Sequence, residues 1–264
     1  IFRQDRYEEI KAKGAEFPVA PEYIEVSFGN ECNFKCGYCH PKASSKFYNE
    51  IRDHGPYDMV TNHRCDIDWL KIFEEETNPF VDAWWRWWPT IRDNVNILRI
   101  TGGEPLLHKS TWALLDDLAA NPMPKLELNI NSNLGVKPIL VNRLATKIRE
   151  LIDNKCIKEF TLFTSIDTWG PQAEYIRTGL DLAQWEKNLD TYMTLSGQSV
   201  SMMMTYNILS VPRFKLLLIK MLEWRKRFEP KPTSERRTVR NVRFDTPYLK
   251  EPLQYDINLL PKEQ

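Results

Sequence analysis

The 264-residue sequence has no net charge, no long apolar run and no internal repeat. Its 36 Lys and Arg residues balance its 36 Asp and Glu residues, so no overall field steers it toward a nucleic acid or an anionic membrane. No apolar run reaches the ~18 residues of a membrane-spanning helix, and the opening IFRQDRYEEIKAKG lacks a signal-peptide pattern. We therefore expect a cytoplasmic protein with no membrane partner and no nucleic-acid partner.

Cysteine is scarce, and its five residues are unevenly placed. The count is odd, and a chain of this length buries a core without disulfide bonds, so we expect reduced thiols. Three of the five, Cys32, Cys36 and Cys39, lie together in the stretch ECNFKCGYCH. We expect Cys65 to be an ordinary free thiol and Cys156 to be a small core residue.

Strand-like and helix-like segments alternate along the chain. The strand-like segments are 23–29, 96–101, 126–131, 159–167, 199–207 and 238–245. The helix-like segments between them are 110–121, 141–154, 182–195 and 211–228. Such alternation favours parallel strands joined by right-handed crossovers, in a barrel or a doubly wound sheet. Six units are too few for the usual closed barrel of eight, so we predict an α/β fold with an open, partial (β/α)6 TIM-like barrel.

The least ordinary residues of the sequence follow the ends of the predicted strands. In both candidate architectures, functional residues belong at the carboxyl ends of the strands. The cysteine stretch follows the first strand, and TGGEP at 101–105 follows the second. The later strand ends bring Asn133, Ser165, Asp167, Asn207, Asp245 and Tyr248 to the same edge.

Two further segments are unusual in composition. The segment 41–95 is long for one crossover and contains DAWWRWWPTIRD, whose four tryptophans occupy every side of a helical turn. At least one face of such a helix must pack against protein, and a partner or substrate surface is the alternative. The basic stretch 224–243 leads into the sixth strand from the opposite edge, which indicates a solvated loop rather than a nucleic-acid site.

The spacing C-x3-C-x2-C places three thiolates on one short loop. A structural zinc site would need a fourth ligand, which His40 or Cys65 offers. A cubane of four irons and four sulfides uses one thiolate for each iron, and electron-transfer clusters normally recruit four cysteines. With three cysteines one iron stays open for another ligand.

The motif TGGEPLL favours the second alternative. Gly102 and Gly103 allow a ligand to approach the backbone without a Cβ in the way. Pro105 holds Glu104 in an extended conformation, which leaves neighbouring peptide groups free to face a ligand. The carboxylate of Glu104 is able to accept hydrogen bonds from an ammonium group. These residues predict a binding site for the amino end of an amino acid.

The stretch CNFKCGYC, followed at the next strand by TGGEP, resembles the radical S-adenosylmethionine superfamily from about residue 23 to about residue 248. The resemblance implies a partial barrel of six βα units with a 4Fe-4S cluster on the three cysteines. It further implies that S-adenosylmethionine chelates the fourth iron. One electron from an external reductant of the flavodoxin or ferredoxin type then yields methionine and a 5'-deoxyadenosyl radical, which removes hydrogen from a substrate.

The resemblance assigns roles residue by residue. The cluster ligands, and the catalytic residues, are Cys32, Cys36 and Cys39. Tyr38 would border the adenine, Gly102, Gly103 and Glu104 would hold the methionine amine, Ser165 and Asp167 would lie near the ribose and methionine carboxylate, and Asn133 and Arg177 would line the pocket. Ser165 and Asp167 have helix capping as an alternative role, and Asn207 has a turn role. Asn207, Asp245 and Tyr248 are candidates from topology alone.

The C-terminal part resembles twitch-type members of the superfamily, which carry a shortened extension. We predict a radical S-adenosylmethionine core at 1–248 and an incomplete extension at 249–264. Such relatives usually have further cysteines there for an auxiliary cluster, and this sequence has none after Cys156. The substrate is a peptide or a small molecule such as a nucleotide or sugar. The alternative from another class is a non-catalytic zinc-binding interaction module.

Overall fold

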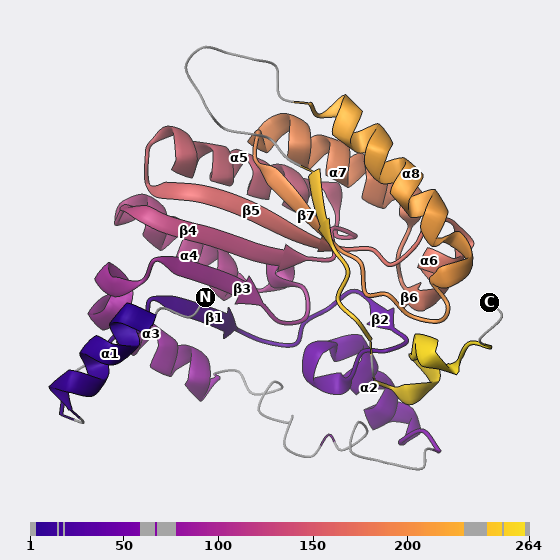
Figure 1. Cartoon of the computed structure of the whole chain (residues 1–264), viewed down its shortest axis with the longest axis horizontal. Coiled ribbons are helices and arrows are strands. Elements are labelled where there is room, and N and C mark those ends of the chain that lie inside the picture. The colour runs from indigo at the N-terminus through magenta and orange to yellow at the C-terminus, as the bar shows by residue number, and fades with distance from the viewer. Residues whose placement is uncertain are drawn as a thin grey trace.

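This computed structural model describes residues 4–14, 16–17, 19–58, 67, 78–229, 242–249 and 251–261. Its centre is a six-stranded sheet in the order β1-β3-β4-β5-β7-β8, in which every neighbouring pair is parallel (Figure 1). The strands are β1 (Tyr23–Ser27), β3 (Ile97–Thr101), β4 (Met123–Ser132), β5 (Ile157–Ser165), β7 (Ser199–Met203) and β8 (Val242–Asp245). All their carboxyl ends therefore meet at one edge of the sheet.

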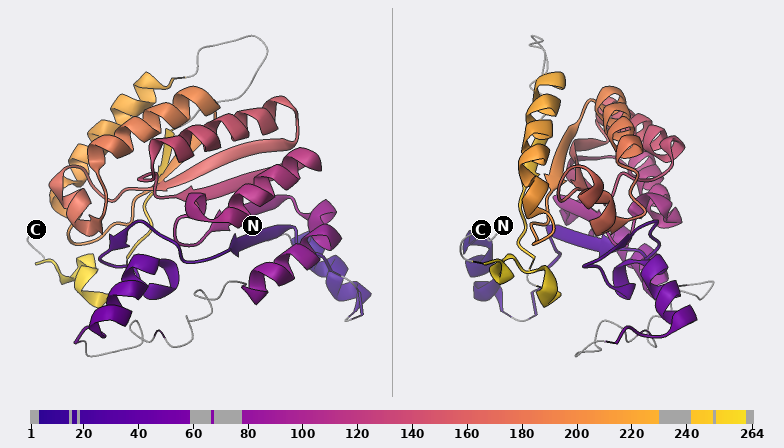
Figure 2. Two further views of the ribbon diagram at one scale, coloured as in Figure 1. Left: turned by 180° about the vertical axis from the view of Figure 1, so that it is seen from behind. Right: turned by 90° about the vertical axis from the view of Figure 1, so that its right-hand side faces the viewer.

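Four long helices connect the strands from β3 onward: α4 (Lys109–Ala120), α5 (Pro138–Asp153), α7 (Leu182–Ser196) and α8 (Val211–Arg227). Helix α5 begins with Pro138 at a position that needs no N–H donor, and its buried residues recur at three- and four-residue spacing. Helices α4, α5 and α7 cover one face of the sheet, and α8 lies alongside the edge strand β8 (Figure 2).

The two faces of the sheet differ in polarity. Along β4, Leu128 and Ile130 are fully buried against the helices, whereas Asn129 and Asn131 are half-buried on the other face. Leu98, Phe160 and Met202 repeat the buried pattern on neighbouring strands. The main core therefore lies between the sheet and the helices.

The remaining elements surround this layer. They are α1 (Gln4–Lys13), α2 (Ser45–His54), α3 (Pro79–Ile91), α6 (Pro171–Ile176), an antiparallel pair of β2 (Lys35–Cys36) with β6 (Arg177–Thr178), and 3₁₀ turns at Pro41–Ala43, Arg92–Asn94, Pro105–Leu107, Leu253–Tyr255 and Ile257–Leu259. Helix α3 carries the four tryptophans. Trp84 and Trp88 are buried and stacked 5.1 Å apart, whereas Trp87 is 45% exposed. The packing prediction for one face of this helix is confirmed.

The prediction of an α/β fold with six parallel strands in chain order is confirmed. The two outermost strands, β1 and β8, form no ladder with each other in the part of the chain that the structure describes, so the sheet is open there. The antiparallel β2–β6 pair and helices α1, α2 and α6 were not predicted. Residues 238–241 of the sixth predicted strand, residues 230–241 of the basic stretch, and Cys65 lie outside the described residues. No helix among the described residues is long and apolar enough to cross a membrane.

Candidate active site

The cysteine loop, residues 28–40, leaves the carboxyl end of β1 and stays at that edge of the sheet. Phe34 in its middle is 1% exposed. A Cβ added to Gly135, in the loop after β4, would lie 2.1 Å from the Phe34 ring, and one added to Gly179 would lie 3.2 Å from it. Gly37 donates its N–H to Ile176 O at 2.8 Å, beside the β2–β6 pair. The loop is therefore anchored to the segments that follow β4 and β5.

Cys36 is buried, and Cys32 and Cys39 are partly buried. Three N–H donors point at two of the sulfur atoms. Phe34 N is 3.4 Å and Asn133 Nδ2 is 3.8 Å from Cys32 Sγ, and Arg177 Nη1 is 3.6 Å from Cys36 Sγ. Burial raises the pKa of the Cys32 thiol to about 11 and that of Cys36 to about 12, although Arg177 partly opposes the rise at Cys36. Such thiols become thiolates when a metal binds them.

The TGGEP loop after β3 runs directly against the cysteine loop. Gly103 donates its N–H to Gly29 O at 3.3 Å, and Glu104 donates its N–H to Glu31 O at 2.6 Å. Added Cβ atoms at Gly102 and Gly103 would lie 2.6 Å from Ser27 Oγ and 2.4 Å from Glu31 O, and Gly102 has a φ of +122°. The close approach that these glycines permit is to the protein's own backbone.

Glu104 is 1% exposed, and its carboxylate accepts hydrogen bonds within the protein. Oε1 accepts from Leu106 N at 3.1 Å and from Ser132 Oγ at 2.8 Å, and Oε2 accepts from Asn133 N at 2.6 Å. Burial raises the pKa of Glu104 to about 7, although these hydrogen bonds oppose the rise. The carboxylate thus joins the loop after β3 to the end of β4.

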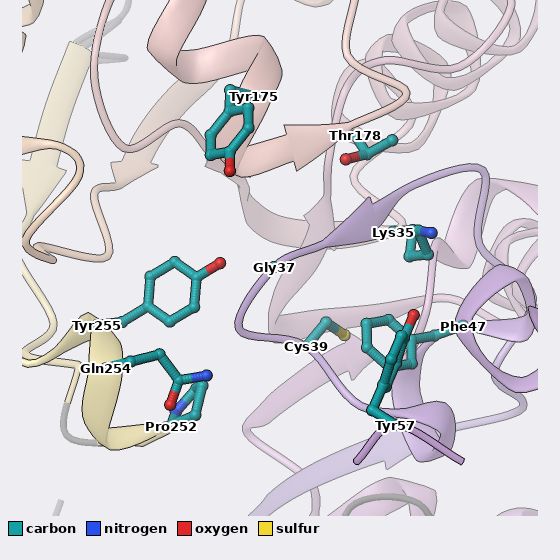
Figure 3. A pocket seen from close by; sticks show the side chains of 10 residues that line it. All are labelled: Lys35, Gly37, Cys39, Phe47, Tyr57, Tyr175, Thr178, Pro252, Gln254 and Tyr255. Carbon is teal, nitrogen blue, oxygen red and sulfur yellow. The ribbon is translucent and has the colours of Figure 1, made fainter. Parts of the chain in front are cut away.

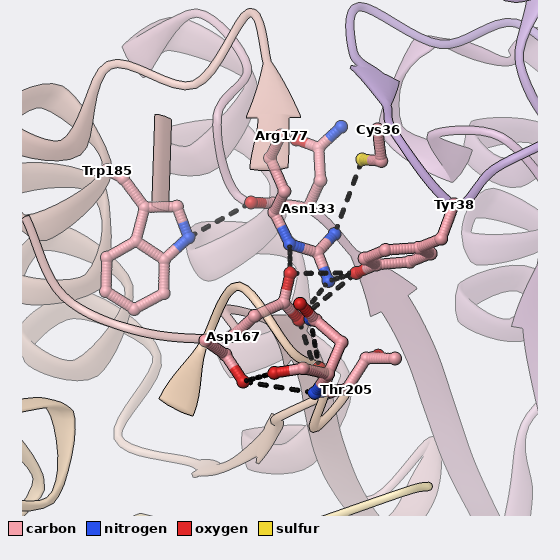
Figure 4. Close-up of polar contacts among 9 residues, drawn as sticks. Cys36, Tyr38, Asn133, Asp167, Arg177, Trp185 and Thr205 are labelled. Carbon is pink, nitrogen blue, oxygen red and sulfur yellow. Dashed lines mark hydrogen bonds and ion pairs between the residues drawn. The ribbon is translucent and has the colours of Figure 1, made fainter. Parts of the chain in front are cut away.

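Asn133 lies between three parts of the site. Its Nδ2 donates to Asn33 Oδ1 at 2.8 Å in the cysteine loop, and its Oδ1 accepts from Gly135 N at 2.8 Å. Its backbone carbonyl accepts from Trp185 Nε1 of α7 at 3.0 Å (Figure 4). Asn133 is therefore held in place while its amide faces Cys32.

Tyr38, Asp167 and Arg177 form a buried cluster (Figure 4). Arg177 donates to both carboxylate oxygens of Asp167, with Nε at 3.0 Å from Oδ2 and Nη2 at 2.9 Å from Oδ1, and it also donates to the Tyr38 hydroxyl. Tyr38 donates to Asp167 at 2.9 Å, and Thr205 N donates to the same carboxylate at 3.1 Å. Burial raises the pKa of Tyr38 well above its ordinary value, so the phenol stays neutral.

The structure thus brings most of the predicted residues together. Cys32, Glu104 and Asn133 meet on one side of the cysteine loop, and Cys36, Tyr38, Asp167 and Arg177 meet on the other. Neither Asp167 nor Ser165 caps a helix, and Ser165 is half-buried at the end of β5.

The three candidates from topology lie at strand ends with other contacts. Asn207 is fully buried and closes a turn through Leu209 N and Thr205 O. Asp245 is exposed at the end of β8, and the Tyr248 hydroxyl contacts Asp256 and Asn258. These contacts are those of a turn residue, which is one of the two roles that the sequence analysis considered for Asn207.

A pocket of about 410 Å³ opens on the outer side of the cysteine loop (Figure 3). Its lining includes Cys39, Phe47 of α2, Tyr175 of α6 and Tyr255 of the C-terminal segment. The Tyr255 hydroxyl would lie 2.1 Å from a Cβ on Gly37, and its ring meets Tyr38 edge to face at 6.2 Å. The C-terminal segment therefore packs directly onto the loop that carries the thiols.

In the described part of the chain, no three His, Cys, Asp or Glu side chains converge on one point as ligands of a single metal ion would. Cys65, one of two fourth ligands considered for zinc, lies outside the described residues.

Four residues that hold the site were not predicted: Phe34, Trp185, Asn188 and Tyr255. Asn188 of α7 is 1% exposed and donates to Leu134 O and Val136 O, both at 2.9 Å. A polar residue on the buried face of a predicted helix is a signal that would have found it. Trp185, Phe34 and Tyr255 look like ordinary core residues in the sequence, so no signal distinguishes them.

No family model matches the sequence. Curated proteins similar to this chain are named GTP 3',8-cyclase. The one from Helicobacter pylori strain J99 is 34% identical over 144 residues, which are 52% of this chain and 37% of that protein. The one from Xanthomonas campestris pv. campestris strain B100 is 26% identical over 162 residues, which are 61% of this chain and 41% of that protein. The chain spans less than half the length of the curated relatives it matches.

These relatives support the resemblance to radical S-adenosylmethionine enzymes that the motifs give. Among solved structures, native anSMEcpe with bound AdoMet aligns with a TM-score of 0.44 and 13% identity, over 82% of this chain and 55% of that one.

Proposed function

We propose that this chain is the core of a radical S-adenosylmethionine enzyme, with a 4Fe-4S cluster on Cys32, Cys36 and Cys39. One observation carries the proposal most directly. The two motifs, far apart in the sequence, are joined backbone to backbone at the carboxyl edge of a parallel sheet, through Gly103 N to Gly29 O and Glu104 N to Glu31 O. That edge is where open α/β sheets bind their ligands.

The residues present fit a cluster with three protein ligands. Three thiols lie on one anchored loop, and N–H groups of Phe34, Asn133 and Arg177 point at two of the sulfur atoms. Hydrogen bonds to cluster sulfurs and the degree of solvent exposure are what set the reduction potential of such clusters. The burial of Cys36 and the partial burial of Cys32 and Cys39 also limit the access of water.

When bound, the cluster would supply the electron that cleaves S-adenosylmethionine into methionine and a 5'-deoxyadenosyl radical, which removes hydrogen from the substrate. The chain's own residues would hold the cluster and orient S-adenosylmethionine. Glu104 joins the TGGEP loop to β4, and the Oε2 atom that accepts from Asn133 N retains one lone pair for an ammonium hydrogen. The Tyr38, Asp167 and Arg177 cluster fixes the aromatic ring beside the third cysteine.

The proposal includes an external one-electron reductant of the flavodoxin or ferredoxin type and a cytoplasmic location. It also includes a twitch-type C-terminal extension, which is supported by the contact of Tyr255 with the cysteine loop. The substrate is a peptide or a small molecule. The relatives are named for a reaction of GTP, so a nucleotide belongs among the small molecules to be tested.

The test is anaerobic reconstitution of the full chain with iron and sulfide, followed by a strong reductant and S-adenosylmethionine. We expect about four irons per chain, the electron paramagnetic resonance signal of a reduced 4Fe-4S cluster, and 5'-deoxyadenosine in the reaction mixture. Cys32→Ala, Cys36→Ala and Cys39→Ala should each lose the cluster and the product. Cys156→Ala, a change at a buried cysteine immediately before β5, should keep both.

Tight zinc binding with no iron uptake and no 5'-deoxyadenosine would overturn the proposal. Equal iron content in the Cys36→Ala and Cys156→Ala variants would show that the three-cysteine loop is not the cluster site.

A further inference from the structure

The sheet face turned away from the helices is polar, which is unusual for parallel strands. Parallel sheets covered on both faces carry near-continuous apolar runs. Here the residues on this face include Arg99 and Thr101 of β3, Asn129 and Asn131 of β4, and Thr161 of β5, and all of them are half-buried. The described helices leave this face of β4 and β5 uncovered (Figure 1). Half-buried polar groups without a protein cover point to a ligand or water against them.

Arg99 projects from β3 across this face toward β5. Its Nε donates to Asn131 Oδ1 at 3.0 Å, and its guanidinium lies 4.4 Å from the centre of the Phe163 ring. These two contacts hold the guanidinium over the middle of the face. No other acceptor among the described residues contacts it, and no described carboxylate lies within ion-pair distance. Its two terminal nitrogens are therefore available to a ligand.

Arg243 reaches β5 on the same face of the sheet, but from the side of the edge strand β8. It lies on β8, and its Nη2 is 3.4 Å from Thr161 Oγ1. Thr161 and Phe163 lie two residues apart on one face of β5, so both guanidiniums extend over the middle of that strand. Like Arg99, Arg243 has no ion-pair partner among the described residues.

None of the four described carboxylates on this face forms an ion pair with either arginine; they are Glu25, Glu127, Glu159 and Asp245. Glu25 pairs in register with Arg99, but its carboxylate accepts from the Tyr23 hydroxyl at 3.1 Å. Glu127 pairs with Lys158 at 2.6 Å. The centre of the face therefore carries two guanidiniums, one of which lies 4.4 Å from the centre of an aromatic ring. This is the arrangement that binds phosphate or carboxylate through paired N–H donors.

We propose that Arg99 and Arg243 bind an oxyanion, a phosphate or a carboxylate, of the small-molecule substrate on this face of the sheet. The inference rests on the proposed function and narrows its substrate class. Asn131, which Arg99 contacts, lies two residues before Asn133, whose amide faces Cys32. Two strand residues span roughly 7 Å. A substrate held here by its oxyanion would therefore lie within roughly 7 Å, along β4, of the residue whose amide faces Cys32.

The test measures anion binding by calorimetry on the full chain without iron or S-adenosylmethionine. The probes are inorganic pyrophosphate and succinate, with glucose as a neutral comparison. We expect saturable binding of at least one anion, and we expect Arg99→Gln and Arg243→Gln each to weaken it about ten-fold or more. Arg99→Lys should bind weakly as well, because an ammonium lacks the paired donors. Arg143→Gln is the matched control, since that exposed guanidinium lies 4.0 Å from the Trp112 ring on the helix side.

Binding of pyrophosphate alone indicates a phosphate ester as substrate, binding of succinate alone indicates a carboxylate, and both outcomes support the proposal. Equal affinity in wild type, Arg99→Gln and Arg243→Gln overturns it, and so does the absence of any binding of either anion to the wild type. Circular dichroism and thermal unfolding confirm that the variants are folded. Because the measurement needs no cluster, its failure leaves the result for 5'-deoxyadenosine untouched, and the reverse also holds.

Discussion

At the scale of single residues, Glu104 shows what a motif does and does not predict. TGGEP predicts a carboxylate beside two glycines at a strand end, and the structure has it there. The motif does not predict the partners, because Ser132 and Asn133 come from the next strand and donate to Glu104 only in the folded chain. Its contact with a cofactor ammonium group stays a prediction.

Replacing Glu104 with Ala should destabilise the fold. Leu106 N, Ser132 Oγ and Asn133 N would lose their acceptor in a buried site, and each buried unpaired polar group costs about 1–3 kcal/mol. We expect the free energy of unfolding to fall by roughly 3 kcal/mol or more in urea denaturation. Glu127→Ala, which removes an exposed partner of Lys158, should cost less than about 1 kcal/mol. Equal losses in the two variants would contradict the anchoring role of Glu104.

The raised pKa of Glu104 predicts a pH dependence of stability. An ordinary glutamate in the unfolded chain loses its proton near pH 4.5, whereas Glu104 in the folded chain keeps it to about pH 7. The folded state therefore binds more protons in this window, and its stability falls as the pH rises from about 4.5 to about 7. The full difference is roughly 3 kcal/mol. Glu104→Gln lacks this titration, so the unfolding free energy of wild type relative to Glu104→Gln should decrease between pH 5 and pH 8. An unchanged difference would contradict the shift.

At the scale of elements, the cysteine loop is held by the insertion of Phe34 between the loops after β4 and after β6. Sequence analysis places the cysteines at the end of the first strand, because strand periodicity and topology are local signals. The anchoring by Phe34 was not predictable, since it depends on Gly135 and Gly179, which lie far along the chain. The β2–β6 pair was missed for a different reason, because a strand of two residues has no periodicity to detect.

Gly135→Ala should disturb the cysteine loop. The new Cβ would lie 2.1 Å from the Phe34 ring, a distance that forces the ring or the loop to move. We expect a loss of about 1–3 kcal/mol of stability and a lower iron content after reconstitution. The double variant Gly135→Ala with Phe34→Leu should recover part of both, because the shorter side chain makes room. Additive losses in the double variant would contradict direct contact. Phe80→Ala, at a ring that is 71% exposed, serves as a control with little effect.

At the scale of the whole molecule, the sequence predicts the strand order and the edge that carries the site. Alternating segments 96–101 and 126–131 became β3 and β4 with small shifts at their ends, because periodicity and crossover handedness are strong constraints. The sequence does not predict which contacts join the loops at this edge of the sheet. The predicted cofactor residues Asp167 and Arg177 bond to each other and to Tyr38, so they tie the cysteine loop to the ends of β5 and β7.

Asp167→Asn should therefore weaken the whole molecule. Asp167 and Arg177 have side chains that are 0% and 7% exposed, so the substitution leaves a buried guanidinium without its counter-charge. Removing one partner of a buried pair costs about 3–5 kcal/mol. Asp190→Asn is the control, because Asp190 pairs with Arg227 at the surface, where the two side chains are 39% and 55% exposed, and should lose about 1 kcal/mol or less.

The double variant Asp167→Asn with Arg177→Met tests the cause of the stability loss in Asp167→Asn. That cause is either the uncompensated charge of Arg177 or the lost contact between the two side chains. If the uncompensated guanidinium causes the loss, removing it as well should restore part of the stability relative to Asp167→Asn alone, because apolar replacements of buried pairs are often neutral. Urea denaturation of wild type, Asp167→Asn, Arg177→Met and the double variant measures the coupling energy. Because Arg177 also points at Cys36 Sγ at 3.6 Å, the double variant should recover stability without recovering the cluster properties of wild type. A double variant less stable than Asp167→Asn would show that Arg177 stabilises the edge without Asp167.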